Sequence, residues 1–139
     1  MRAAPRADPR RRPRALVVVD ASVFGALVFN ESRSGEAADL LTARTLAAPG
    51  LVHYEMANIA RTKMLRNPGT GDLLSRAFRR WLDLPVNLLT PDFADVLAIA
   101  TTEGISAYDA AYICVARDLR APLLTFDERL AAVWERSGA

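Results

Sequence analysis

The sequence predicts an α/β fold built around a mostly parallel sheet. Short apolar runs alternate with segments of helical periodicity, which is typical of repeated βαβ units. The chain has 139 residues, of which 51% are hydrophobic and 24% are charged. These values suit one globular domain with a sizeable core. The crossovers between parallel strands are expected to be right-handed.

The first half of the predicted domain holds one strand and three helices. The apolar run at residues 16–19 is typical of a buried strand. The segment 51–66 repeats apolar side chains at helical spacing and is followed by Asn67, Pro68 and Gly69, which together end a helix. In order, the predicted elements are a strand at 16–19 and helices at 22–29, 35–46 and 51–66.

The second half continues this alternation. Thr90 before Pro91 offers an N-cap with proline in the first turn, and Gly104 ends the helix that they open. Ser106 is expected to cap the next helix. In order, the predicted elements are a helix at 72–82, a strand at 86–89, helices at 91–103 and 107–119, a strand at 123–126 and a helix at 127–136.

The cysteine content and the hydropathy pattern predict a cytoplasmic protein. The single cysteine, Cys114, lies in an apolar helical stretch, so we expect a buried thiol in a reducing compartment. No apolar run approaches the roughly 18 residues of a membrane span. The N-terminal arginines are not followed by the apolar region of a signal peptide.

The first 14 residues differ from the rest of the chain in charge. They hold six arginines and one aspartate, a net charge of +5, whereas the remaining residues hold 12 cationic and 15 anionic side chains, a net charge of −3. Prolines interrupt the arginines and no apolar periodicity is visible, which predicts a disordered basic tail at residues 1–14 before a domain at 15–139. Such a tail is either a solvated extension, the simpler interpretation, or an arm that binds RNA phosphates without specificity.

Four carboxylates occur where apolar elements should hold them against bulk water: Asp20, Glu55, Asp109 and Asp127. Asp20 and Asp127 each follow a predicted buried strand, and ligands of parallel α/β sheets bind beyond the carboxyl ends of the strands. Capping is the structural alternative for three of them. Asp20 and Asp127 could cap the helices that follow, and Asp109 could close a capping box with Ser106.

Glu55 is the carboxylate that capping does not explain. It is predicted to lie in the middle of a helix, four residues after Leu51 and four before Ile59, on the side that should face the core. An unpaired carboxylate there costs several kcal/mol or becomes neutral, so it needs a cation, a hydrogen-bond network or a metal ion. Asn58, one turn later, could orient it.

Together the four acids indicate a divalent-metal site. No lysine or arginine is placed in the sequence to neutralise all of them, and carboxylate oxygens suit Mg²⁺ or Mn²⁺. His53 is the only histidine, so a zinc site is not expected, and this side chain is predicted to lie at a helix surface or cap. Three aromatic residues at helical spacing, Trp81, Trp134 and Phe78, are predicted to belong to the core and not to stack on bases.

Four short segments of the chain resemble the PIN domain, specifically the VapC-type toxins. No single segment is specific, but the four occur in the order and spacing of that family, and the resemblance runs from about residue 15 to 138. The segments are 18–22 (VVDAS), 55–58 (EMAN), 106–112 (SAYDAAY) and 125–127 (TFD).

This resemblance implies a three-layer α/β/α sandwich with a central, mostly parallel sheet. It also implies a Mg²⁺- or Mn²⁺-dependent endoribonuclease that hydrolyses RNA phosphodiester bonds and acts as the toxin of a type II toxin–antitoxin system. The implied catalytic and metal-binding residues are Asp20, Glu55, Asp109 and Asp127, with Ser22, Asn58 and Thr125 as polar residues around them.

The resemblance implies three partners: RNA, a cognate VapB-like antitoxin and a second copy of the chain. Antitoxins of such systems lay an extended or helical segment, often with an arginine, across the acidic cleft. We expect a homodimer that forms through the helices around residues 35–65. We do not expect the protein to bind a membrane. Arg61, Lys63 and Arg66 are candidate RNA-binding residues at the rim, where they would offset the repulsion between RNA and the acids.

The sequence departs from the family pattern at both ends. The family domain usually starts almost at the first residue, so the basic tail is additional. Many members continue past the position of Gly138 into one more edge strand, and we expect that strand to be missing here.

Two other classes of protein could explain clustered acids. Phosphoryl-transfer domains of the haloacid-dehalogenase type need a second aspartate two residues after the first, where this chain has Ser22, and those of the receiver type need a lysine on a late strand, which is not found. The other class is a non-catalytic PIN-like module that serves as a scaffold, although the presence of all four acids argues against it.

Overall fold

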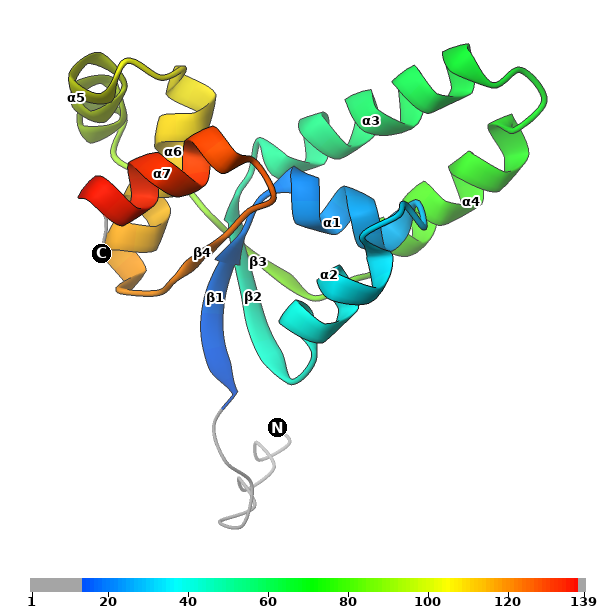
Figure 1. Cartoon of the computed structure of the whole chain (residues 1–139), viewed down its shortest axis with the longest axis horizontal. Helices are drawn as coiled ribbons and strands as arrows, with labels where there is room; N and C mark the ends of the chain where they lie inside the picture. The colour runs from blue at the N-terminus through cyan, green and yellow to red at the C-terminus, as the bar shows by residue number, and fades with distance from the viewer. Residues whose placement is uncertain (1–13, 138–139) are drawn as a thin grey trace, which may run out of the picture.

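The computed structural model describes residues 14–137. The predicted basic tail, except for Arg14, and the family's additional edge strand fall outside the described residues. The chain runs in this order: β1 (Ala15–Val19), α1 (Ala21–Val28), α2 (Ser34–Leu41), β2 (Arg44–Pro49), α3 (Val52–Arg66), α4 (Gly71–Leu82), β3 (Val86–Leu89), α5 (Phe93–Glu103), α6 (Ala107–Leu119), β4 (Leu123–Leu124) and α7 (Glu128–Ser137) (Figure 1).

The four described strands form one parallel sheet in the order β3-β2-β1-β4. In the register of β1 against β2, Val17 is opposite Leu46 and Val18 is opposite Ala47. Val17, Val18 and Val19 have no solvent-exposed surface because β1 lies inside the sheet with layers on both faces. The predicted parallel α/β class is therefore confirmed.

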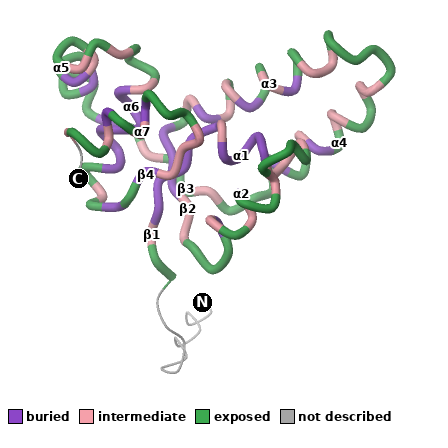
Figure 2. The backbone as a smooth tube through the Cα atoms, in the orientation of Figure 1, coloured by how far each residue is buried: buried purple, intermediate pink, exposed green. Residues whose placement is uncertain are grey.

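Helices cover the sheet in two groups, which makes a three-layer α/β/α sandwich. Helix α6 contacts β1, β2 and β4, and α5 packs against α6. On the other side, α1 contacts α2, α3 and α4. Helices α3 and α4 form a hairpin whose far end projects away from the sheet (Figure 1). Figure 2 shows that the tip of this hairpin is exposed, whereas the buried residues concentrate around the sheet.

The predicted helix at residues 35–46 is wrong in its second half. Helix α2 ends at Leu41, Ala43 has a φ of 58°, and β2 follows from Arg44 to Pro49. The alanines of this run favour a helix locally, but Ala47 and Ala48 are completely buried because β2 pairs with both β1 and β3. Tertiary pairing overrides local propensity here.

Several predicted helix ends are confirmed and one is corrected. Ser106 caps α6 through a 3.1 Å hydrogen bond from the backbone N–H of Asp109, and Gly104 ends α5 with a φ of 65°. Thr90 is not the N-cap of α5. Asp92 takes that role, since its Oδ1 accepts a hydrogen bond from the N–H of Asp95 at 3.1 Å.

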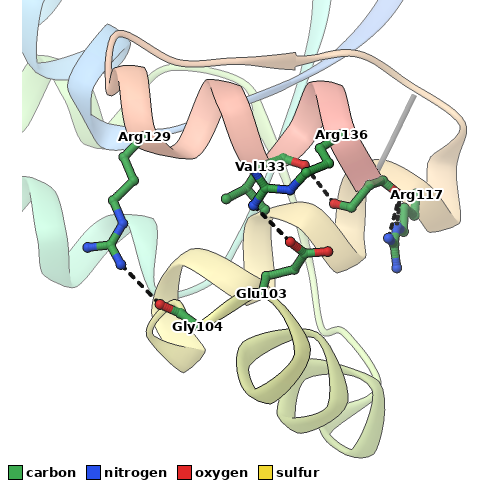
Figure 3. Close-up of polar contacts among 7 residues, drawn as sticks. Glu103, Gly104, Arg117, Arg129, Val133 and Arg136 are labelled. Atoms are coloured by element: carbon green, nitrogen blue, oxygen red, sulfur yellow. Dashed lines mark hydrogen bonds and ion pairs between the residues drawn. The ribbon is translucent and has the colours of Figure 1, made fainter.

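Polar contacts attach the last helix to α5 and α6 (Figure 3). Arg129 donates to the carbonyl oxygen of Gly104 at 3.0 Å, and Arg136 forms an ion pair with Glu103 at 3.0 Å. Arg117 of α6 donates to the carbonyl oxygen of Ser137. These contacts fix the direction in which α7 leaves the sheet, and so the position of the residues just before it.

The core contains most of the side chains predicted for it. Trp81 is 1% exposed, Cys114 is buried, and Phe78 and Trp134 are partly buried against the core. His53 is corrected: its ring packs edge-on against Trp81 with centroids 5.4 Å apart, so it is not a simple surface or cap residue. No helix within residues 14–137 is long and apolar enough to cross a membrane.

Candidate active site

The C-terminal edge of the sheet gathers the predicted acidic residues. Asp20 follows β1 directly, Glu55 lies in the first turn of the helix after β2, and Asp127 comes just after β4. Asp109 lies in the first turn of α6, the helix that covers β1 and β2. Parallel strands bring their carboxyl ends to one edge, which explains why distant parts of the chain meet there.

Asp20 is the most deeply placed of the four acids, with 6% of its surface exposed. Its Oδ1 accepts hydrogen bonds from the hydroxyl of Ser22 at 2.6 Å and from the N–H groups of Ser22 and Val23 at 3.1 and 3.3 Å. It therefore does cap α1, as its structural alternative predicted. Burial raises the pKa of the Asp20 carboxyl, and these hydrogen bonds oppose that shift.

Ser22 and Thr125 connect the two ends of the domain around Asp20. The hydroxyl of Thr125 donates to Asp20 Oδ2 at 2.5 Å and accepts from the N–H of Asp127 at 3.0 Å. The hydroxyl of Ser22 accepts from the N–H of Phe126 at 2.9 Å. The segment after β4 is thus held against the segment after β1 by hydrogen bonds to a single carboxylate and its neighbours.

Glu55 is paired with a residue that the sequence analysis did not identify as part of the site. Its Oε1 accepts a 2.6 Å hydrogen bond from the hydroxyl of Tyr112, which is 1% exposed. Glu55 lies in the first turn of α3 and not in the middle of a helix, because α3 begins at Val52. Asn58 is exposed, and the hydrogen bonds within residues 14–137 do not connect it to Glu55.

The charges of the acids act on one another. Burial raises the pKa of Glu55, and the negative charges of Asp20 and Asp109 raise it further, against the hydrogen bond from Tyr112. Burial and then the negative charge of its partner Glu55 raise the pKa of Tyr112 far above its ordinary value. The phenol therefore stays protonated and can only donate to the carboxylate.

Asp109 and Asp127 differ in how their carboxylates are used. The hydroxyl of Ser106 caps α6, so the cap does not need the Asp109 carboxylate. Burial raises the pKa of Asp109, the charges of Asp127 and Asp20 add to the shift, and Arg129 opposes it. Asp127 is exposed, and its Oδ1 accepts from the N–H groups of Arg129 and Leu130 at 2.9 and 3.1 Å. Its alternative as an N-cap is therefore confirmed.

The donor set fits a divalent cation chemically. Burial raises the pKa values of Asp20, Glu55 and Asp109, and neighbouring negative charge raises those of Glu55 and Asp109 further, which is the effect that a bound cation would reverse. In the present side-chain positions, no three Asp, Glu, His or Cys residues of the described part of the chain lie close enough to hold one metal ion.

A cleft of about 490 Å³ adjoins this acidic cluster. Ser22 and Asn58 line it, and so do Lys63 and Arg66, two of the three predicted RNA-binding residues. Arg61 is not at this rim. It lines a second groove between α3 and α4, because a two-residue step along a helix turns a side chain by about 200°.

Comparisons with known proteins agree with this architecture. The family model of the PIN domain matches residues 17–135. Ribonuclease VapC3 of Pyrobaculum aerophilum is 34% identical over 120 residues, covering 83% of this chain and 92% of the relative. Ribonuclease VapC9 of Mycobacterium tuberculosis is 34% identical over 119 residues, covering 84% and 89%.

Solved structures share the fold. The crystal structure of PAE2754 from Pyrobaculum aerophilum superposes with a TM-score of 0.68 at 26% identity, covering 86% of each chain. The VapC20 toxin of Mycobacterium tuberculosis, described as cleaving the sarcin-ricin loop, superposes with a TM-score of 0.60 at 17% identity, covering 84% of this chain and 93% of that one. With its family match, its relatives and its acidic sheet edge, the chain belongs to the PIN-domain family, in the group of VapC-type proteins.

Proposed function

We propose that this protein hydrolyses RNA phosphodiester bonds at the cluster formed by Asp20, Glu55, Asp109 and Asp127, with Mg²⁺ or Mn²⁺ as cofactor. As a VapC-type PIN domain it is an endoribonuclease and the toxin of a type II toxin–antitoxin system. The observation that supports the site is that three of these acids, from the segment after β1, from α3 and from α6, lie at one sheet edge, where the charge of Asp20 raises the pKa values of both Glu55 and Asp109.

Each acid has a role that follows from its contacts. Asp20 is buried and fixed by the hydroxyls of Ser22 and Thr125, so it would be the central ligand with a fixed orientation. Glu55 is oriented from behind by Tyr112. Asp109 and Asp127 would complete the ligand set from α6 and the start of α7. A bound divalent ion lowers the pKa of its water and offsets charge that develops on the phosphate, so histidine is not required as a base.

The partners follow from the same assignment. The substrate is RNA, and the inhibitor is a VapB-type antitoxin. We propose that the antitoxin covers the acidic cluster and so competes with the metal ion and the substrate. The homodimer through the helices around residues 35–65 and the cytoplasmic location stay predictions.

The experiment that tests this function is RNA cleavage by Asp109→Asn at increasing Mg²⁺ or Mn²⁺. We expect cleavage by the wild type to depend on the metal ion and cleavage by the variant to be lost, while far-UV circular dichroism shows an unchanged fold. Asp83→Asn is the matched control, because Asp83 is exposed at the end of α4. Cleavage by Asp109→Asn at the wild-type rate, or a wild type that is equally active in EDTA, would contradict the proposal.

A further inference from the structure

The cleft beside the acidic cluster has a chemistry of its own. None of the described residues that line it is one of the four acids. It is lined by the cationic residues Arg33, Lys63 and Arg66 and by one acid, Glu31, which lies 3.7 Å from Lys63. Its volume of about 490 Å³ falls within the roughly 300–1,000 Å³ that is usual for ligand sites. The cleft therefore flanks the proposed reaction centre and favours an anionic ligand.

One cation in this cleft is fixed in place. The guanidinium carbon of Arg33 lies 3.7 Å from the centroid of the Phe126 ring, which is close enough for stacking and a cation–π interaction. Glu36 accepts two hydrogen bonds from Arg33, from Nε at 2.8 Å and from Nη2 at 2.9 Å. The Arg33 side chain is nevertheless 49% exposed. The guanidinium group of Arg33 lies over the Phe126 ring, and both residues line the cleft.

This pair is connected to the acidic cluster through the backbone. Phe126 lies between Thr125 and Asp127, and its N–H donates to the hydroxyl of Ser22, which in turn donates to Asp20. The ring that supports Arg33 is thus positioned by the same hydrogen bonds that position Asp20. A ligand bound against Arg33 would therefore occupy a cleft that is also lined by Ser22, which donates to Asp20.

We propose that Arg33, supported by Phe126, is a stacking platform for a nucleobase of single-stranded RNA next to the scissile phosphate, and that Lys63 and Arg66 hold the adjoining backbone phosphates. This inference rests on the proposed function and adds a binding subsite to it. Unpaired bases are recognised by stacking on aromatic rings and guanidinium planes, and phosphates by lysine and arginine.

An acidic peptide is the competing ligand for a cationic cleft, and the geometry of Arg33 disfavours it. Carboxylates prefer the edge of the guanidinium, where two parallel N–H groups point the same way. In this protein Glu36 occupies the edge formed by Nε and Nη2. The edge formed by Nη1 and Nη2 and the flat face beside the aromatic ring remain, and the flat face suits a base better than a carboxylate.

The test compares Arg33→Ala and Arg33→Lys in steady-state cleavage of an RNA substrate. Loss of one stacked base, worth about 1–3 kcal/mol, corresponds to an increase in KM of about 5- to 160-fold. We expect this increase in both variants, with kcat within about twofold of the wild type because the acids are untouched. Lysine keeps the charge but not the plane, so it should not rescue KM.

Arg44→Ala is the matched control, since Arg44 is an exposed arginine at the start of β2, at the opposite edge of the sheet from the acids. Its KM should equal that of the wild type. A wild-type KM in Arg33→Ala would overturn the proposal, and so would full rescue by Arg33→Lys, which would reduce Arg33 to a point charge. Unchanged RNA kinetics with weaker binding of the antitoxin would assign the cleft to the partner protein.

A binding measurement separates this proposal from the proposed function. Fluorescence anisotropy with a single-stranded RNA 12-mer of mixed sequence reports affinity whether or not the RNA is cleaved. If the wild type binds the 12-mer more tightly than Arg33→Ala but cleaves nothing, the platform is supported and the nuclease assignment fails. If Asp109→Asn abolishes cleavage but Arg33→Ala binds the 12-mer as the wild type does, the nuclease assignment stands and the platform fails.

Discussion

The hydroxyl of Tyr112 donates a 2.6 Å hydrogen bond to Oε1 of Glu55, and this contact joins the helix on one side of the sheet edge to the helix that follows β2. Tyr112 is 1% exposed, so the bond is shielded from water on the tyrosine side. The hydrogen bond lowers the pKa of Glu55 against the effects of burial and neighbouring charge. Tyr112 therefore helps to keep Glu55 ionised and in one orientation.

Tyr112→Phe should weaken both the fold and the site. Removal of a buried hydrogen bond to a charged group costs about 1–3 kcal/mol of unfolding free energy. The pKa of Glu55 should rise further, so the acid limb of the cleavage pH profile should move to higher pH. Denaturant unfolding and the pH dependence of kcat measure the two effects. Tyr108→Phe is the control on the same helix, because Tyr108 is 69% exposed and should tolerate loss of its hydroxyl. An unshifted acid limb in Tyr112→Phe would show that Tyr112 is only structural.

The strands that end in acids could be predicted from the sequence, and one central strand could not. Residues 16–19 form an apolar run with no helical alternative, and the acid that follows them lies at the sheet edge as expected. Residues 44–49 contain alanines that suit a helix equally well, and only pairing with β1 and β3 makes them a strand. Pairing between parallel strands depends on residues far apart in the sequence, so the local pattern of residues 44–49 does not predict it.

The partners of the acids were harder to predict than the acids themselves. Ser22 and Thr125 each lie within two residues of an acid in the sequence, and the resemblance placed both around the acids; both contact Asp20, although Thr125 is 105 residues away from it. Tyr112 is 57 residues from Glu55, and a tyrosine in an apolar helix predicts only a core position. Its pattern carries one usable signal: Tyr112 is three residues after Asp109, so both lie on the same side of α6.

Asp109→Asn should make the metal-free protein more stable at neutral pH. The pKa of Asp109 is raised in the folded state, so its contribution to stability is fully present below the ordinary pKa of 3.8 and is lost as the pH rises through the raised value. The variant should therefore have a higher unfolding free energy than the wild type above pH 3.8. The difference should grow until the pH passes the raised pKa of Asp109 and then stay constant. Partial solvation of the carboxyl limits it to less than about 1 kcal/mol. Urea unfolding in EDTA at a series of pH values measures it, and a variant that is less stable than the wild type at pH 7 would contradict the repulsion argument.

Mg²⁺ or Mn²⁺ should stabilise the wild type and not Asp20→Asn. A ligand that binds only the folded state adds about 1.4 kcal/mol to the unfolding free energy at ten times its Kd. Asparagine can still accept from Ser22 and donate to Thr125, so the cap of α1 should survive while the charge is lost. Thermal melts with and without metal, at constant ionic strength, make the comparison. Equal stabilisation of wild type and variant would mean that the ion binds elsewhere.

Substitutions of Asp127 can separate its structural role from its proposed catalytic one. Its Oδ1 accepts from two N–H groups at the start of α7, and an amide oxygen can do the same, so Asp127→Asn should keep the stability of the fold. Asp127→Ala should lose about 0.5–2 kcal/mol through loss of the cap. Both variants lose the carboxylate charge, so both should lose RNA cleavage to a similar degree. Denaturant unfolding and metal-dependent RNA cleavage, measured for both variants, distinguish the structural role from the catalytic one. If Asp127→Asn cleaves normally while Asp127→Ala does not, the residue serves the reaction only by holding the start of α7 in place.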